Sequence, residues 1–174
     1  MPMNPKTLEE EVKRDNNKVT YWLLNYTQKK KEIEQLKEDL ILSGSYSLEN
    51  RLPVKTNLTT DPTAKKVILL VDKLAEEEKW LKLIEEVEQR LPVKLRLLLQ
   101  LRRQAGQERS NIVRYRGRPS WIPYVQCRYC EMLAKATGKE EEDVWIGDPK
   151  TFFVMWNRIV EYTCRLSGKR GLLN

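Results

Sequence analysis

The sequence contains no histidine, only seven glycines and only three cysteines among its 174 residues. Without histidine the chain lacks the commonest general base, the serine and cysteine dyads that depend on imidazole, and the two-histidine zinc motifs. A Walker loop and a glycine-rich dinucleotide fingerprint are also missing. These absences argue against an enzyme, so we expect no catalytic residue and no cofactor.

Long apolar runs are missing as well. No run approaches the roughly 18 residues that a membrane span requires, and the N-terminal MPMNPKTLEEEV lacks the basic-then-apolar order of a signal peptide. An odd number of cysteines fits a reducing compartment better than a secreted disulfide framework. The sequence therefore predicts a cytoplasmic protein with no membrane partner.

Two of the cysteines, Cys127 and Cys130, stand three residues apart in the stretch VQCRYCEMLAKATG. On a helix this spacing brings both sulfurs to one face, which a zinc site or a redox pair could use. Zinc would require four ligands and only Cys164 remains, while a redox pair would follow a strand and here follows a proline. We expect all three to fill a helical core near Trp156 and to bind no metal, with zinc binding as the alternative.

The positive charge is concentrated in the second half of the chain. Residues 1–90 carry 16 lysines and arginines against 17 acids, whereas residues 91–174 carry 16 against 8, so the formal net charge of +7 arises there. The segment Lys94–Arg118 contains seven arginines and a single acid, Glu108. Because guanidinium groups bind phosphate bidentately, this segment favours contact with a polyanion. The alternative is that the arginines only solvate a helix and a loop.

Apolar residues at heptad spacing predict two long helices in the first half. Thr7 and Glu10 form a capping box for a helix that ends near Leu42, and Asp61 with Pro62 opens a second helix. Residues 43–60 form a connector. The apolar stripes are Val12, Val19, Trp22, Tyr26, Ile33, Leu36 and Leu40 in the first helix and Val67, Leu70, Leu74, Leu81, Ile84 and Leu91 in the second. Such stripes pair within one chain or between copies, and we expect a homo-oligomer.

The second half predicts three shorter helices. Pro92 ends the preceding helix, and VKLRLLLQLRRQ restarts with leucines on several sides, as in a buried helix. After a basic loop, Ser120 caps a helix over residues 121–136 that Gly138 ends, and Asp148 with Pro149 opens the last helix. The acidic KEEEDVWIG between them forms a turn whose carboxylates are solvated. No strand is indicated, so the fold is expected to be all-α.

The last two helices have the order of a helix-turn-helix, whose second helix presents its N-terminal residues to base edges. Residues Phe152, Met155, Trp156, Ile159, Thr163 and Leu166 form an inward stripe. Asparagine and arginine bind adenine and guanine bidentately, so the outward residues Lys150, Thr151, Asn157 and Arg158 are the candidate base contacts. The candidate phosphate contacts are Arg102, Arg103, Arg109, Arg114, Arg116, Arg118, Arg128, Arg165, Lys169 and Arg170. The alternative is a solvated face of a helical bundle.

The order of these elements resembles a known family. The helix start DPTAKKV, the heptad helix, and LPVKLRLLLQLRR leading into a helix-turn-helix are similar to the phage late-gene transcription activators of the RinA and ArpU type. Their C-terminal part is similar to region four of bacterial sigma factors. The resemblance runs from Ser43 to Leu166, and this chain inserts the arginine-rich residues 107–120 and the acidic residues 140–147. It implies double-stranded DNA and bacterial RNA polymerase as partners in a host-cell cytoplasm.

The sequence thus predicts a sequence-specific DNA-binding regulator of phage or prophage late genes. Its residues 1–91 would assemble or hold the polymerase, and its residues 92–174 would bind DNA. One alternative is a phage DNA-packaging recognition subunit, the small terminase, which also combines a helix-turn-helix with helical assembly. Two others are a phage protein that binds RNA polymerase without reading DNA, and a cysteine-dependent redox or zinc protein.

Overall fold

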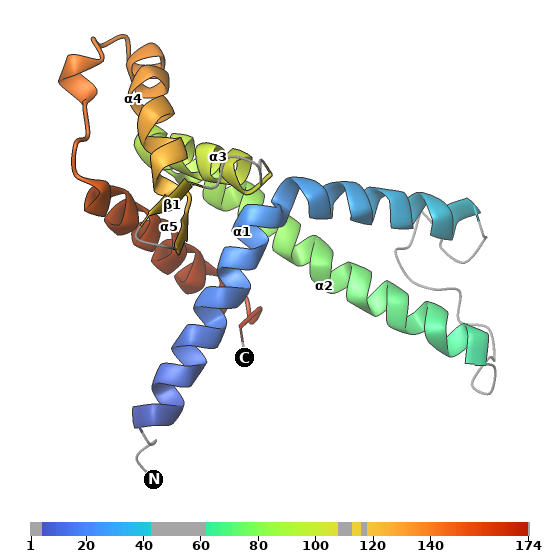
Figure 1. Cartoon of the computed structure of the whole chain (residues 1–174). Helices are drawn as coiled ribbons and strands as arrows, with labels where there is room; N and C mark the ends of the chain where they lie inside the picture. Colours follow the sequence, from blue (N-terminus) through green and yellow to red (C-terminus); the bar gives the residue numbers. More distant parts are fainter. Residues whose placement is uncertain (1–4, 43–61, 108–112, 116–117, 174) are drawn as a thin grey trace. The chain divides into compact units, whose positions relative to one another are not determined.

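The computed structural model describes residues 5–42, 62–107, 113–115 and 118–173 (Figure 1). The elements are α1 (Pro5–Leu42), α2 (Pro62–Arg90), α3 (Val93–Gln107), β1 (Val113–Tyr115), β2 (Arg118–Ser120), α4 (Ile122–Thr137), the 3-10 turn η2 (Glu142–Val144) and α5 (Pro149–Lys169). Apart from one short hairpin, this described secondary structure is helical. The predicted helical class is therefore confirmed. The predicted connector, residues 43–60, lies outside the described residues.

The helices belong to two compact units. One comprises Met1–Asn25 with Ile84–Asn174, and the other comprises Tyr26–Leu83. These limits differ from a division after Leu91, because the first part of α1 and the end of α2 pack with the C-terminal helices. The assignment of assembly to residues 1–91 and of DNA binding to residues 92–174 stays a prediction.

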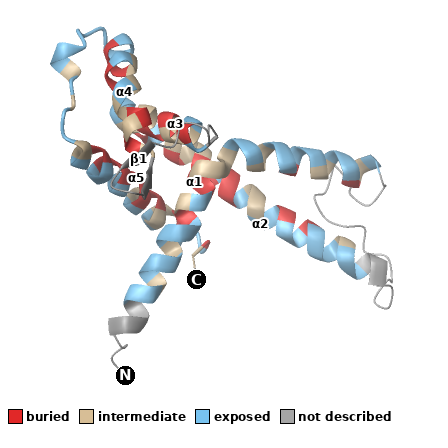
Figure 2. Ribbon diagram, viewed as in Figure 1, coloured by how far each residue is buried: buried red, intermediate tan, exposed pale blue. Residues whose placement is uncertain are grey.

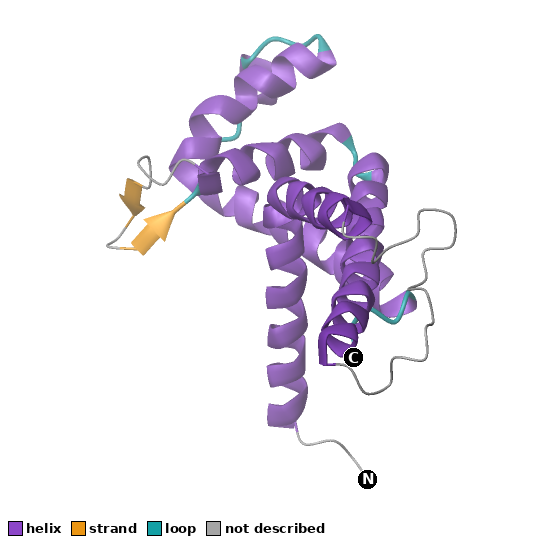
Figure 3. Ribbon diagram, turned by 90° about the vertical axis from the view of Figure 1, so that its right-hand side faces the viewer, coloured by secondary structure: helices purple, strands orange, loops and turns teal. Residues whose placement is uncertain are grey.

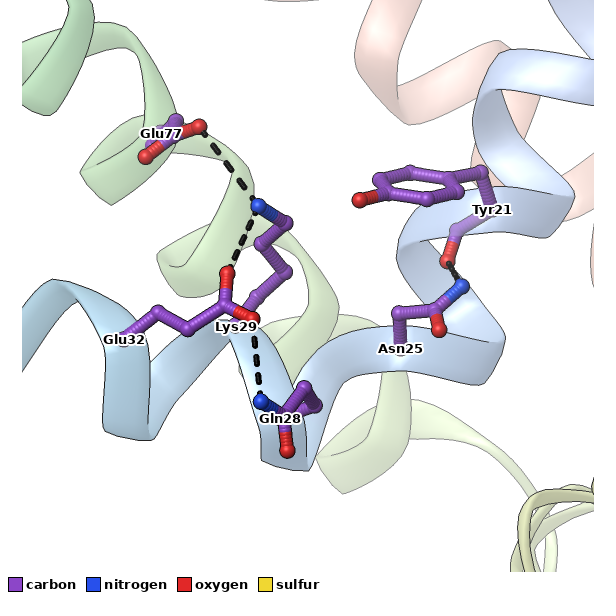
Figure 4. A network of polar contacts seen from close by, with 6 residues as sticks. All are labelled: Tyr21, Asn25, Gln28, Lys29, Glu32 and Glu77. Atoms are coloured by element: carbon purple, nitrogen blue, oxygen red, sulfur yellow. Dashed lines mark hydrogen bonds and ion pairs between the residues drawn. The ribbon is translucent and has the colours of Figure 1, made fainter. Parts of the chain in front are cut away.

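The unit Tyr26–Leu83 is a helical hairpin in which the second part of α1 runs antiparallel to α2 (Figure 1). Buried residues of the predicted stripes lie on both helices, including Ile33, Leu40 and Leu74. Lys29 of α1 joins the two helices at their polar edge, because its Nζ lies 2.8 Å from Glu32 and 4.0 Å from Glu77 of α2 (Figure 4).

The other unit is built around the leucine-rich helix α3. Leu98, Leu99 and Leu101 are all fully buried, which confirms the predicted buried helix. Helices α4 and α5 pack on α3 with their buried faces, coloured red in Figure 2. Where α4 meets α5, the rings of Tyr129 and Phe152 meet edge to face with centroids 5.4 Å apart. This three-helix core fixes which face of α5 points outward.

Parts of α1 and α2 complete the same unit. Val19, Leu23, Val87 and Leu91 are buried there, and the Lys18 ammonium donates to the carbonyl of Leu172 at 3.1 Å (Figure 2). The predicted stripe fails at its first position, because Val12 of α1 is 53% exposed. In the hairpin unit Leu70 of α2 is likewise 40% exposed.

Pro92 separates α2 from α3, as predicted. A proline ring prevents the chain from continuing the α2 hydrogen-bond ladder, and the carbonyl of Pro92 instead accepts from the amides of Leu95 and Arg96, both at 3.0 Å. The Arg96 guanidinium turns back and donates to the carbonyl of Leu91 at 3.0 Å. At the break the carbonyl of Val87 in α2 accepts from the amide of Leu91, and the carbonyl of Leu91 accepts from Arg96, so both are satisfied.

The basic segment between α3 and α4 contains an antiparallel hairpin, which the sequence prediction missed (Figure 3). Val113 pairs with Ser120, Arg114 with Pro119 and Tyr115 with Arg118. A β-branched and an aromatic residue at alternate positions, followed by a glycine-containing link, form the sequence signal of a hairpin. The prediction of a loop without strands was wrong here. Each strand pairs over three residues only, which is too short to show a clear alternation of apolar and polar residues.

Two predicted helix starts differ from the structure, and two are confirmed. Helix α1 begins at Pro5 rather than Thr7, and α4 is preceded by Trp121 rather than capped by Ser120. Proline is accepted within a first helical turn, so α1 begins two residues earlier than expected, whereas α4 begins one residue later, at Ile122. Pro62 and Pro149 begin α2 and α5 as predicted.

Candidate nucleic-acid interface

Helix α5 carries the candidate base contacts, and its start is fixed by a side-chain cap. The Asp148 carboxylate accepts from the amide of Lys150 at 2.9 Å, and Pro149 occupies the first helical position. Aspartate there accepts from an otherwise unpaired amide, and its negative charge is stabilised by the positive end of the helix dipole. The predicted cap is confirmed, so the first residues of α5 have a defined orientation.

The inner face of α5 matches the predicted stripe. Five of its six residues are buried: Phe152, Met155, Trp156, Ile159 and Thr163. Leu166 is half-buried. The hydroxyl of Thr163 donates to the carbonyl of Ile159 at 2.7 Å, which satisfies the polar atom inside the core. Helical spacing alone therefore identified the buried face.

The opposite face of α5 is exposed and mostly basic or polar. Lys150, Asn157 and Arg158 are exposed, while Thr151 is half-buried. Further along the helix Arg165 and Lys169 are also exposed, and the single acid of this face is Glu161. Three of the four candidate base contacts thus lie accessible on one helical face, although their contact with bases stays a prediction.

An aromatic stack lies beneath the start of α5. The Arg102 guanidinium of α3 lies over two indole rings, 3.6 Å from the centroid of Trp156 and 4.4 Å from that of Trp121. Trp121 in turn meets Phe153 of α5 edge to face at 5.8 Å. Burial lowers the pKa of Arg102 to about 9, so the guanidinium keeps its charge at pH 7. Cation–π attraction offsets part of the cost of burying that charge.

Arg102 and Arg103 were predicted as phosphate contacts, and the structure gives both an internal role. Arg102 is held in the stack described above. Arg103 donates from Nε to the carbonyl of Leu23 at 2.7 Å and from Nη1 to Glu88 at 2.8 Å. A guanidinium engaged in this way would have to leave its partners to reach DNA. Their contact with phosphate stays a prediction, and these internal contacts make it less favourable than contact by an exposed arginine.

The other candidate phosphate contacts fall into four groups. Arg128 is half-buried and lies over the ring of Tyr124 at 3.8 Å, and the exposed Arg170 pairs with Glu86. Arg114 and Arg118 lie on the paired strands, and their backbone position is all that is described. Arg109 and Arg116 lie outside the described residues. The fourth group, Arg165 and Lys169, is exposed on α5.

The connection between α4 and α5 is long. Gly138 ends α4 in the left-handed conformation, with φ of 66°, as predicted. The chain then passes through η2, and Gln126 of α4 donates from its side chain to the carbonyl of Gly147 at 3.2 Å. Residues 138–148 exceed the three- or four-residue turn of an ordinary helix-turn-helix. The acidic run is exposed at Glu140, Glu141, Glu142 and Asp143, as expected for solvated carboxylates.

The three cysteines differ in exposure. Cys130 is buried and Cys164 is half-buried, but Cys127 is exposed, so its predicted place in the core was wrong. Position 127 faces solvent because Tyr124, Cys130 and Leu133 take the buried positions of α4. Among the described residues, no group of three or more cysteines, aspartates or glutamates is placed to hold a metal ion.

We expect a thiol reagent to modify Cys127 first in the folded protein. Burial, followed by the charges of Asp15 and Glu161, raises the pKa of Cys164, whose thiol also donates to Asn16 at 3.3 Å. Thiolate is the reactive form, so Cys164 reacts slowly, and Cys130 is shielded. Mass spectrometry after timed alkylation and proteolysis measures the three rates, with urea-unfolded protein as the control. Modification of Cys130 as fast as Cys127 would contradict this assignment.

Comparison with known proteins gave no match: no family model, curated protein or solved structure is similar to this chain. Within the part of the chain that the structure describes, no helix combines the length and apolar composition needed to cross a membrane.

Proposed function

We propose that the protein is a sequence-specific DNA-binding regulator of phage or prophage late genes that acts with host RNA polymerase. One observation carries the DNA-binding part: α5 packs its apolar face on α3 and α4 and leaves Lys150, Asn157, Arg158 and Arg165 exposed along the other. A helix anchored in this way fits the major groove, where asparagine and arginine recognise adenine and guanine. The resemblance to late-gene activators supplies the phage and polymerase context.

The proposed arrangement is a helix-turn-helix in which α4 supports α5, with the long connection as an elaboration. Excess positive charge supports it, because residues 91–174 carry 16 basic and 8 acidic residues. DNA attracts such a surface without regard to sequence, and the groove-facing side chains then add discrimination. Arg114 and Arg118 on the hairpin remain candidate phosphate contacts.

The test is binding to duplex DNA at several salt concentrations. We expect the logarithm of the association constant to fall with the logarithm of salt at a slope steeper than about −3, since each neutralised phosphate contributes about −0.9. Lys150, Arg158, Arg165 and Lys169 supply four exposed cations on α5 alone. Fluorescence anisotropy with a labelled duplex measures the slope. Binding that does not change with salt would contradict the proposal.

Matched variants separate base contact from general attraction. Asn157→Ala and Arg158→Ala should each remove about 1–3 kcal/mol of discrimination between the preferred duplex and a scrambled one. Lys139→Ala is the control, since Lys139 is an exposed cation on the connection rather than on α5. It removes one charge and should leave discrimination unchanged. If all three variants left discrimination unchanged, binding would rest on attraction by charge alone.

A DNA-packaging recognition subunit is the second candidate, favoured by one observation on the hairpin unit. Ile68, Leu69 and Leu70 at the start of α2 are 45%, 68% and 40% exposed, a run of apolar surface that suits self-association. Packaging subunits assemble into rings of many copies. A native mass measurement separates the two candidates, because a monomer or dimer excludes such a ring.

A further inference from the structure

Two apolar residues interrupt the polar exposed face of α5. Phe153 is 50% exposed and Val154 is 52% exposed. Phe153 lies three residues after Lys150 and four before Asn157, and Val154 lies four residues after Lys150 and four before Arg158. Helical spacing therefore places all five on one broad face. Exposing an apolar side chain to water is unfavourable, so contact with a ligand would explain why two such residues lie in the middle of a polar stripe.

The ring of Phe153 is held in its exposed place by the neighbouring core. One edge contacts Trp121 with an angle of 75° between the rings. Trp121 is itself fixed, because the Arg102 guanidinium lies over both Trp121 and Trp156. The exposed part of the ring is therefore presented by a supported stack. Val154 needs no such support, since its branched side chain on a helix has one strongly preferred rotamer.

The surrounding charges indicate what these residues contact. An apolar site for a protein partner is expected to form a larger patch with charges excluded from its centre. Here Lys150, Asn157 and Arg158 surround two apolar residues, which fits a polyanion that also presents small apolar groups. In the major groove of DNA, that apolar group is the 5-methyl of thymine.

We propose that Phe153 and Val154 contact the 5-methyl groups of thymine, so that the protein prefers duplexes with thymine at defined positions. This inference rests on the proposed DNA-binding function. It makes Phe153 and Val154 specificity-determining residues and Arg102 and Trp121 positioning residues. The sequence prediction named neither residue among the candidate base contacts.

The test uses the full chain and a duplex selected from a random library by repeated rounds of binding. Each thymine of the selected site is then replaced by uracil, which removes only the methyl group and preserves base pairing. We expect the wild-type protein to bind about fourfold more weakly for each contacted methyl, because burying one methyl group corresponds to about 0.8 kcal/mol. Fluorescence anisotropy measures the ratio of the two affinities.

The variant Phe153→Ala/Val154→Ala should bind the thymine and uracil duplexes equally. Val93→Ala is the matched control, because Val93 is a 42% exposed aliphatic residue on α3 rather than α5, and it should keep the wild-type ratio. Circular dichroism during thermal unfolding establishes that both variants are folded.

The possible outcomes distinguish failure of the proposed function from failure of the thymine inference. If no duplex is enriched by selection, the proposed function fails and the inference fails with it. If a duplex is enriched but uracil substitution leaves its affinity unchanged, or its preferred positions contain no thymine, only the inference is overturned. If the double variant keeps the wild-type ratio, another residue reads the methyl groups.

Discussion

Phe152→Ala is expected to lower the free energy of unfolding by about 3–5 kcal/mol, the usual cost of truncating a buried phenylalanine. Phe152 is fully buried and contacts Tyr129 of α4 edge to face. Tyr129 is also buried, and its hydroxyl donates to the carbonyl of Lys94 in α3 at 2.8 Å. The two rings thus join three helices, and the cavity left by alanine would loosen all of them. Urea unfolding followed by circular dichroism measures the loss.

The adjacent residue provides the matched control. Phe153→Ala removes the same atoms from a half-exposed position, so we expect a loss of about 1 kcal/mol or less. Comparing the two variants tests the assignment of the inner and outer faces of α5. Equal losses would contradict that assignment and, with it, the exposed face on which the DNA-binding proposal depends.

Arg103→Ala is expected to lower the free energy of unfolding by about 3 kcal/mol, because removing one partner leaves a charge without compensation. Only 10% of the Arg103 side chain is exposed, and its guanidinium joins the carbonyl of Leu23 in α1 to the carboxylate of Glu88 in α2. Alanine would leave both acceptors without this donor. Thermal or urea unfolding of the full chain measures the change.

Two further variants define the role of Arg103. Arg103→Lys keeps the charge but cannot reproduce two donors in the fixed geometry of a guanidinium, so it should recover only part of the stability. Arg165→Ala removes an exposed arginine of α5 and should change stability by about 0.5 kcal/mol or less. If Arg165→Ala lost as much stability as Arg103→Ala, the different exposure of the two arginines would not reflect different structural roles.

Composition alone could not distinguish the arginines with internal partners from the exposed ones. The sequence shows an arginine-dense segment, and density alone assigns Arg102 and Arg103 to the same surface as the later arginines. Their neighbours held a signal that could have separated them: Leu98, Leu99 and Leu101 surround α3 with apolar residues. A helix buried on several sides has little free surface, so arginines near its end are placed to find internal partners.

The sequence determined the local structure of this protein. Apolar spacing identified the helices, and Pro92, Gly138 and Asp148 marked their limits, because backbone geometry and capping depend on neighbouring residues. Spacing also identified the inner and outer faces of α5. These properties follow from interactions within a few residues along the chain.

Only the tertiary structure decided which polar and aromatic groups remain available. Arg102 meets two tryptophans from other helices, Arg103 reaches α1 and α2, and Cys127 turns to solvent while Cys130 does not. The partners of Arg102 and Arg103 are mostly distant in sequence, so a local pattern can suggest burial but cannot name them. The same packing holds Phe153 against Trp121 with half of its surface exposed, and this placement makes Phe153 a candidate for contact with thymine.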